Sequence, residues 1–202
     1  MKNVIPSAIP TEAKYKLLTG SIIPRPIGVV STLSHSGVAN FAPFSYFNIV
    51  SHDPMTISFS IAGPKADGTE KDTLRNAKPI SEGGLGEFVV HIATEHFASA
   101  ISKSAMPLSA SESEFELTGL TAEASTIVKV PRIKEAPIAF ECRTIHVVPV
   151  GESRLIIGEI ICMHFAEDVL EDNYYINYNN LKAIGRTSSA RYCRSTDIFE
   201  EY

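Results

Sequence analysis

The sequence predicts a mainly β protein, an antiparallel barrel with a few helices, and three observations support this prediction. Residues 55–61 alternate hydroxyl with apolar side chains, the period-two pattern of a half-buried strand. Six or seven strand-like segments occur along the chain, without the regular strand-helix alternation that would build a parallel sheet. Two long apolar segments flank a turn at 149–153 and predict a C-terminal hairpin. A closed antiparallel barrel is therefore the expected architecture.

The individual elements are expected where residue types of one kind concentrate between turn signals. Strands are predicted where Val, Ile, Thr and aromatic residues gather, at 27–33, 38–41, 55–61, 87–93, 127–130, 138–150 and 155–165. Thr11 can cap a helix over 10–19, and Asp72 or Thr73 can cap a brief helix that ends before Pro79. Phe97 and Ile101, spaced by four, predict a helix over 94–105.

Composition bounds the class of protein. A chain of 202 residues is expected to form one domain over 1–202. The net charge of -5 leaves no basic excess for nucleic acid, and the longest apolar stretch, 155–166, falls short of the ~20 residues of a membrane span. No signal-peptide core stands at the N-terminus, and the three cysteines contain no C-x-x-C pair, so we expect a cytoplasmic protein without a disulfide framework.

Common catalytic and metal motifs are not matched. The six histidines have none of the spacings that aim two imidazoles at one metal, so no metal site is predicted. The segment at 151–155 lacks the second glycine of a nucleophile elbow, which argues against a serine hydrolase. Gly63 and Gly68 have phosphate-loop spacing, but Thr69 and Glu70 replace the residues that would contact phosphate and magnesium.

What remains is a set of polar donors on a β framework, which suits the holding of a polar, anionic ligand. Its members are Ser31, Thr32, Asn40, Ser45, Ser58, Ser60, Lys71 and Thr73. The alternative, from spacing alone, is an ordinary capped surface helix with a solvated Lys71.

Ordered motifs along nearly the whole chain resemble those of the flavin reductase-like FMN-binding split barrels. The motifs are RPIGVVST at 25–32, NFAPFSYF at 40–47, KDT at 71–73, GEFVV at 86–90, GLT at 119–121, PRI at 131–133 and GR at 185–186. Within that family the sequence is most similar to the subgroup of nitrilotriacetate monooxygenase component B, the reductase partner of a two-component oxygenase.

The resemblance implies a six-stranded antiparallel split barrel that forms a homodimer and binds one FMN per subunit. Ser31 and Thr32 would approach the flavin, and Asn40, Ala42, Pro43, Phe44 and Ser45 would line its ring and ribityl chain. Ser60, Lys71 and Thr73 would hold the phosphate, with Asp72 as the helix cap. A dianionic phosphate prefers such charge-assisted donors, and the ring prefers an apolar wall.

One departure concerns the nicotinamide. Many free-standing flavin reductases carry Gly-Asp-His near the end of the barrel, and here the aligned segment reads Gly151-Glu152-Ser153-Arg154. His164, after the last strand, and Arg186, which can pair with dinucleotide phosphates, are the candidate contacts in its place. For His164 the alternative is a packed, hydrogen-bonded structural histidine, and for Arg186 ordinary surface packing.

The predicted function is an NAD(P)H-dependent flavin oxidoreductase that supplies reduced FMN to an oxygenase component. A non-enzymatic FMN carrier or one-electron-transfer flavoprotein on the same barrel is the alternative, which the missing Gly-Asp-His segment favours. A barrel that has lost flavin is disfavoured, because the segments at 40–45 and 71–73 both stand intact.

Overall fold

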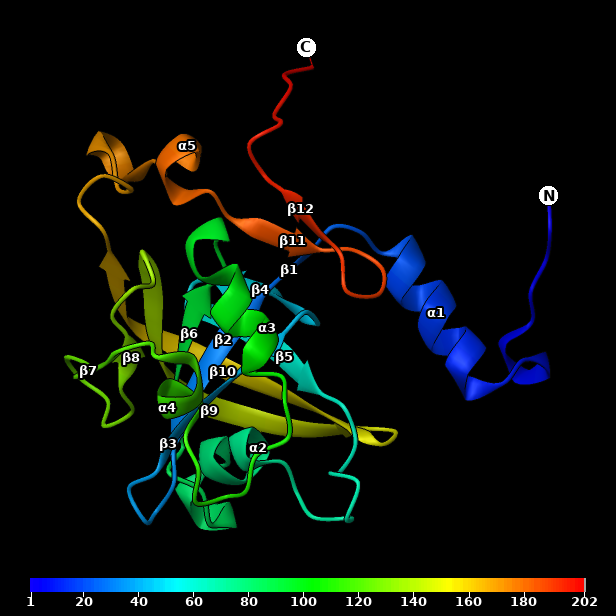
Figure 1. Cartoon of the computed structure of the whole chain (residues 1–202), viewed down its shortest axis with the longest axis horizontal. Coiled ribbons are helices and arrows are strands. Elements are labelled where there is room, and N and C mark those ends of the chain that lie inside the picture. The colour runs from blue at the N-terminus through cyan, green and yellow to red at the C-terminus, as the bar shows by residue number, and fades with distance from the viewer. Residues whose placement is uncertain (202) are drawn as a thin grey trace.

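A seven-stranded antiparallel sheet forms the body of the molecule, as seen in a computed structural model that describes residues 1–201 (Figure 1). The strand order is β3-β2-β6-β9-β10-β5-β4. The strands are β2 (Gly28–Leu33), β3 (Ala39–Phe44), β4 (Phe47–His52), β5 (Met55–Ile61), β6 (Glu87–Ile92), β9 (Ile138–Val150) and β10 (Ser153–Phe165).

The two edge strands of this sheet, β3 and β4, are consecutive in the chain and are separated only by Ser45 and Tyr46. At this break the Ser60 N–H donates to the carbonyl oxygen of Tyr46 at 2.9 Å. The expected split barrel is therefore confirmed, with seven strands instead of six. The strand β4 was not predicted; it follows β3, the second strand of the predicted first hairpin, after a bend.

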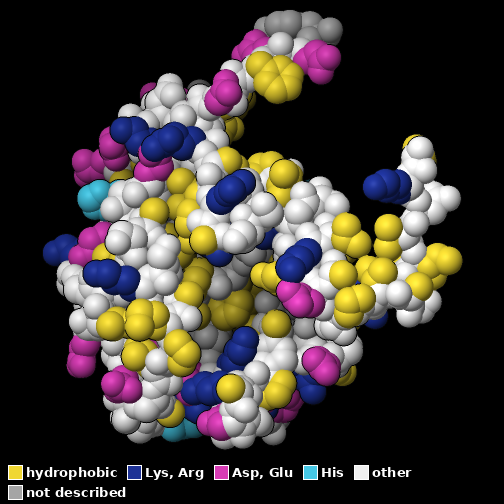
Figure 2. Space-filling view, turned by 45° about the vertical axis from the view of Figure 1, so that its right-hand side comes forward, with side chains coloured by type: hydrophobic (Ala, Val, Ile, Leu, Met, Phe, Trp, Pro, Cys, Tyr) yellow, Lys and Arg dark blue, Asp and Glu magenta, His cyan; other side chains and the backbone are white. Residues whose placement is uncertain are grey.

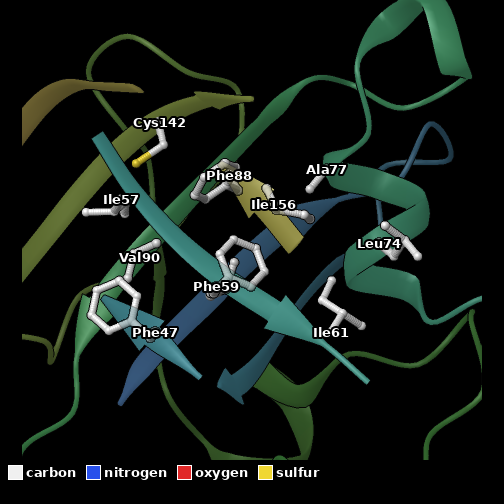
Figure 3. Packing of buried hydrophobic residues seen from close by; sticks show 11 residues of the cluster. Phe47, Ile57, Phe59, Ile61, Leu74, Ala77, Phe88, Val90, Cys142 and Ile156 are labelled. Atoms are coloured by element: carbon white, nitrogen blue, oxygen red, sulfur yellow. The ribbon is translucent and has the colours of Figure 1, made fainter. Parts of the chain in front are cut away.

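The main hydrophobic core fills the barrel, and its aromatic rings meet at Phe59 (Figure 3). The Phe59 ring centroid lies 5.0 Å from that of Phe44 and 5.3 Å from that of Phe88. On β5 the apolar residues of the alternating pattern, Ile57, Phe59 and Ile61, are buried, as the pattern predicts. α2 closes one end of this core with Leu74 and Ala77.

Helices are short and lie around the barrel (Figure 1). They are α1 (Thr11–Ser21), α2 (Asp72–Ala77), α3 (Ala98–Lys103), α4 (Glu114–Thr118) and α5 (Tyr178–Leu181), with 3-10 turns at Pro6–Ala8, Ile80–Glu82, Glu95–Phe97 and Asp172–Tyr174. Two small sheets complete the fold: β1 (Arg25–Pro26) with β11 (Ile184–Arg186) and β12 (Tyr192–Arg194), and β7 (Ala122–Glu123) with β8 (Arg132–Ile133).

Three local predictions need correction. Thr11 is the first residue of α1 and not its cap, and Asp72 is the first residue of α2, whose N-cap position is taken by Lys71 without a side-chain hydrogen bond. The segment 127–130 is not a strand but a series of bends. Its apolar residues Val128 and Val130 are buried, because a carboxylate from β9 anchors the adjoining backbone.

α1 projects from the body of the molecule and leaves apolar side chains on its surface (Figure 1). Leu17, Leu18 and Ile22 are all exposed. No helix within residues 1–201 combines the length and the apolar character needed to cross a membrane.

Candidate functional site

A cleft made of three cavities that share lining residues runs along β3 and the residues that follow it. The main cavity, about 480 Å³, lies between residues 40 and 44 of β3, the loop at 64–66, the start of α2 at 71–73, the segment 104–108 after α3, and Glu114. A second cavity of about 340 Å³, the tail cavity, shares Pro43 and Ala105 with the first. A third, the α1 cavity of about 430 Å³, shares Arg25 and Ser45 with the tail cavity.

The face presented in Figure 2 is hollowed near its middle. Hydrophobic side chains lie on the floor of the hollow, and Lys and Arg side chains stand at its border. A ligand with one apolar part and one anionic part suits such a surface.

Most of the residues predicted to contact a flavin meet in this cleft. Those that line the main cavity are Asn40, Ala42, Pro43, Phe44, Lys71, Asp72 and Thr73. Ser45 lines the tail and α1 cavities, and Arg186 lines the tail cavity. Two segments about 30 residues apart in the sequence are thus brought to one wall, because α2 packs beside the β2–β3 hairpin.

Four predicted residues do not line these cavities. Ser31 is fully buried and donates to the Pro131 carbonyl oxygen at 2.7 Å, so it fastens β2 to the segment before β8. Thr32 is also fully buried. Ser60 is half-buried on β5, where it lies opposite Leu155 in the ladder with β10. His164 lines a separate cavity together with Arg132 and Lys134.

The Thr32 hydroxyl and Oδ1 of Asn40 belong to a buried hydrogen-bond network. The Thr32 hydroxyl donates to Oδ1 of Asn40, its partner across the hairpin. Nδ2 of Asn76, on α2, donates to Thr32 Oγ1 at 3.1 Å and to Asn40 Oδ1 at 3.2 Å. Because all three residues are buried, the network holds α2 in a defined place against β2 and β3.

Lys71 is the cation of the main cavity that no acid neutralises. It is half-buried and forms no ion pair with any residue from 1 to 201. The neighbouring Lys65 does form one, with Nζ 2.6 Å from Asp72 Oδ2. Thr73 adds a buried hydroxyl next to Lys71 in the same wall. This pair of donors is available to an anion.

Asp72 organises the cations around the cavity. Its second oxygen lies 2.5 Å from Nη2 of Arg75, one helical turn further along α2. Burial alone would raise the pKa of Asp72, but the hydrogen bonds from Lys65 and Arg75 outweigh it and hold the pKa below its usual value. The predicted capping role is therefore replaced by an ionic link between the loop at 64–66 and α2.

Glu114 on α4 places a second carboxylate in the main cavity. The side chain is only 9 % exposed, and Oε2 accepts the Phe41 N–H at 3.1 Å. Burial raises the pKa of Glu114 above its usual value. One of three glutamates in the polar segment SESEFE gives no sequence signal for such burial, and Glu114, Lys65 and the segment 104–108 were not predicted as site residues.

The tail cavity is framed by two arginines that lie opposite each other in the β1–β11 ladder. The guanidinium of Arg186 lies 4.7 Å from the ring centroid of Tyr192, a cation–π contact. Arg25 is buried and donates to the carbonyl oxygens of Thr19 at 2.6 Å and Thr187 at 3.0 Å. Arg25 is thus structural, whereas Arg186 has no acidic partner among residues 1–201.

His164 lies on β10, outside the three cavities of the cleft, in a cluster with Glu141 of β9 and Cys162 of β10. Its Nε2 lies 2.6 Å from Oε1 of the fully buried Glu141, and 3.7 Å from the Cys162 sulfur. Glu141 also accepts the backbone N–H groups of residues 126, 127 and 128, at 2.7 to 2.9 Å. Burial would raise the pKa of Glu141, but these hydrogen bonds lower it to about 2.

In this cluster the potential metal-ligand atoms of Glu141, Cys162 and His164 lie within 4.8 Å of one another. No spacing in the sequence suggested this arrangement. Both oxygens of Glu141 already accept hydrogen bonds, so the contacts account for Glu141 as the anchor of the segment 126–128. Within one subunit, Arg186 is the nicotinamide candidate that the cleft contains, and His164 is not.

The chain is similar over its length to several known proteins. The flavin reductase like domain matches residues 19–183. Nitrilotriacetate monooxygenase component B from Bacillus cereus is 40% identical, with a TM-score of 0.92 over 100% of this chain and 98% of its own. Pseudomonas fluorescens 2-nitrobenzoate 2-nitroreductase NbaA is 30% identical, with a TM-score of 0.88 over 100% and 95%. An uncharacterized protein of Bacillus subtilis, YwrF, is 38% identical over 192 residues, 92% of this chain and 90% of its own. The chain therefore belongs to the flavin reductase-like family.

Proposed function

We propose that the chain binds FMN in the β3 cleft and acts as an NAD(P)H-dependent flavin oxidoreductase. The observation that carries the proposal is the main cavity, where a cation without an acidic partner, Lys71, stands at one end of an apolar wall. FMN has the matching parts, a dianionic phosphate and a flat, largely apolar ring.

The residues of the cavity fit this ligand. Lys71 and Thr73 would hold the phosphate by charge-assisted hydrogen bonds. Ala42, Pro43 and Phe44 offer the apolar surface on which a ring can lie. The network of Thr32, Asn40 and Asn76 keeps the two walls at a fixed separation, so the cavity does not have to form when the ligand arrives.

FMN, when bound, would supply the two-electron acceptor, so the chain needs no acid-base pair of its own. The chain's part is to orient a dinucleotide beside the ring. Arg186 has its guanidinium in the tail cavity, which adjoins the main cavity at Pro43 and Ala105, and a guanidinium suits a dinucleotide phosphate. His164 lines a separate cavity, so it would contact a dinucleotide only if the dinucleotide reached that cavity.

A partner oxygenase is part of the proposal. The similar protein from Bacillus cereus is by name component B of a monooxygenase, so we infer that reduced FMN passes from this chain to an oxygenase component. The alternative is an FMN carrier or one-electron-transfer protein, which the segment Gly151-Glu152-Ser153-Arg154 favours because it lacks the Asp-His pair.

Anaerobic rapid mixing of the FMN-loaded protein with excess NADH, and separately with NADPH, tests the activity. Loss of the visible absorption of oxidised flavin within seconds is expected. Arg186→Met should raise the KM for the dinucleotide more than it lowers kcat. Arg191→Met, which removes an equal charge from an exposed position of the same tail, is the control. FMN that stays oxidised with both nucleotides, yet reacts with dithionite, would establish the carrier instead.

We further propose that the protein is a homodimer in the cytoplasm. In addition to the exposed apolar residues of α1, the β4–β5 hairpin exposes Ile49, Val50 and Met55, and a second subunit would cover such apolar side chains. The three cysteines contain no C-x-x-C pair and suggest no disulfide framework, which supports the proposal of a reducing compartment. Light scattering at micromolar concentration with FMN present should give the dimer mass, and a monomer mass would contradict the proposal.

A further inference from the structure

Glu114 is an acid in the main cavity to which the proposed function assigns no task. More than nine-tenths of the residue is buried, and one carboxylate oxygen accepts the Phe41 N–H. The carboxylate also accepts its own backbone N–H, and Glu114 forms no ion pair with any residue between 1 and 201. A largely buried carboxylate without a cationic partner is costly for folding alone, which points to a role toward the ligand.

The other charges of the cavity are accounted for. Asp72 is paired with both Lys65 and Arg75, so its single negative charge is balanced and one positive charge of the group remains. Lys71 is available to the phosphate. Glu114 is the carboxylate of the main cavity that has no ion-pair partner within residues 1–201.

We propose that Glu114 makes the cavity discriminate between the two redox states of the flavin, by weakening the binding of the reduced form. This inference rests on the proposed binding of FMN. Oxidised flavin has a neutral ring, and uptake of two electrons and one proton leaves the ring with one negative charge. The phosphate has the same charge in both states, so its repulsion from Glu114 cancels in the comparison, and only the ring charge counts.

The size of the effect follows from the size of the cavity. A space of about 480 Å³ is roughly 10 Å across, and two like charges at that separation repel by enough to weaken binding about ten- to twentyfold at an effective dielectric constant of ~20. Glu114 would thus help the protein release reduced flavin to a partner while it retains the oxidised form.

The test compares the affinities of both redox states by a thermodynamic cycle. The dissociation constant of oxidised FMN is measured by fluorescence titration, and the midpoint potential of bound FMN by anaerobic dithionite titration against a reference dye. In the wild type the bound potential should lie below that of free FMN by at least about 30 mV, which for two electrons is tenfold weaker binding of the reduced form.

The variant Glu114→Gln keeps an oxygen acceptor for the Phe41 N–H but removes the charge. It should strengthen the binding of reduced FMN about tenfold relative to oxidised FMN, and raise the bound potential by about 30 mV. Glu116→Gln removes the same charge from an exposed position of the same helix and should leave the potential unchanged.

A Glu114→Gln potential equal to or below the wild-type value would overturn the inference, since a protonated Glu114 that donates to the flavin gives that result. Wild-type protein that binds reduced FMN as tightly as oxidised FMN also overturns it, and this measurement decides the question if the variant does not fold. Wild-type protein that binds no FMN at all overturns the proposed function as well.

Discussion

Replacing Lys71 by Ala should weaken FMN binding while leaving riboflavin binding nearly unchanged. Lys71 caps α2 through its backbone only, without a side-chain hydrogen bond, so the substitution leaves the start of the helix intact. A charge-assisted hydrogen bond contributes about 1.5 to 3 kcal/mol, which corresponds to a loss of about ten- to 150-fold. Because the side chain is half-buried, solvent screening favours the lower half of that range. Riboflavin lacks the phosphate and should lose less than about twofold.

Titration of flavin fluorescence at two salt concentrations measures both ligands with the same protein. The control is Lys129→Ala, which removes one charge from an exposed lysine that does not line the main cavity. Equal affinity for FMN in Lys71→Ala and the wild type would place the phosphate elsewhere. A parallel loss of riboflavin binding would mean that the substitution disturbs the cavity as a whole.

Three further predictions concern stability. Burial lowers the pKa of His91 to about 4, whereas the imidazole of the unfolded chain takes up a proton near its ordinary pKa of 6.5. The free energy of unfolding should therefore fall by roughly 3 kcal/mol as the pH falls from 6.5 to about 4. Urea titrations should show a flatter pH profile for His91→Gln. Asn76→Ala should cost about 1 to 3 kcal/mol in the same assay, since two buried acceptors lose their amide donor, and an unchanged urea midpoint would contradict this. Gly158→Ala should lower stability by about 1 to 3 kcal/mol because its Cβ would overlap the Phe88 ring, whereas Gly20→Ala, with open space around it, should not.

The sequence predicted the barrel well where a local pattern determines the structure. The alternation at 55–61 follows from one face packing against the core, and it appears in the structure as a buried set around Phe59. The segment 127–130 is also rich in apolar residues, but its backbone is held by the side chain of Glu141, 13 to 14 positions further along the chain. Composition alone therefore predicted a strand, whereas the backbone N–H groups of residues 127 and 128 donate to the Glu141 side chain and not to a neighbouring strand.

The site could be predicted only as far as its contiguous motifs reach. The segments 40–45 and 71–73 do meet at one cleft. Asn40 lines the main cavity, whereas Thr32 does not. A residue type says nothing about whether its polar atoms are already used, and here the Thr32 hydroxyl is bonded to Asn40 and Asn76. Glu114 joins the cavity through a contact 73 positions away, which no local pattern encodes.

The buried guanidinium of Arg25 has a mechanical consequence for the whole molecule. Through the carbonyl groups of Thr19, Ile22 and Thr187 it ties the N-terminal helix and the C-terminal tail to the same point. α1 and the tail segment at Thr187 are therefore held to one buried cation that lines the tail and α1 cavities. Loss of the Arg25 side chain would release both segments together and change the opening through which ligands enter.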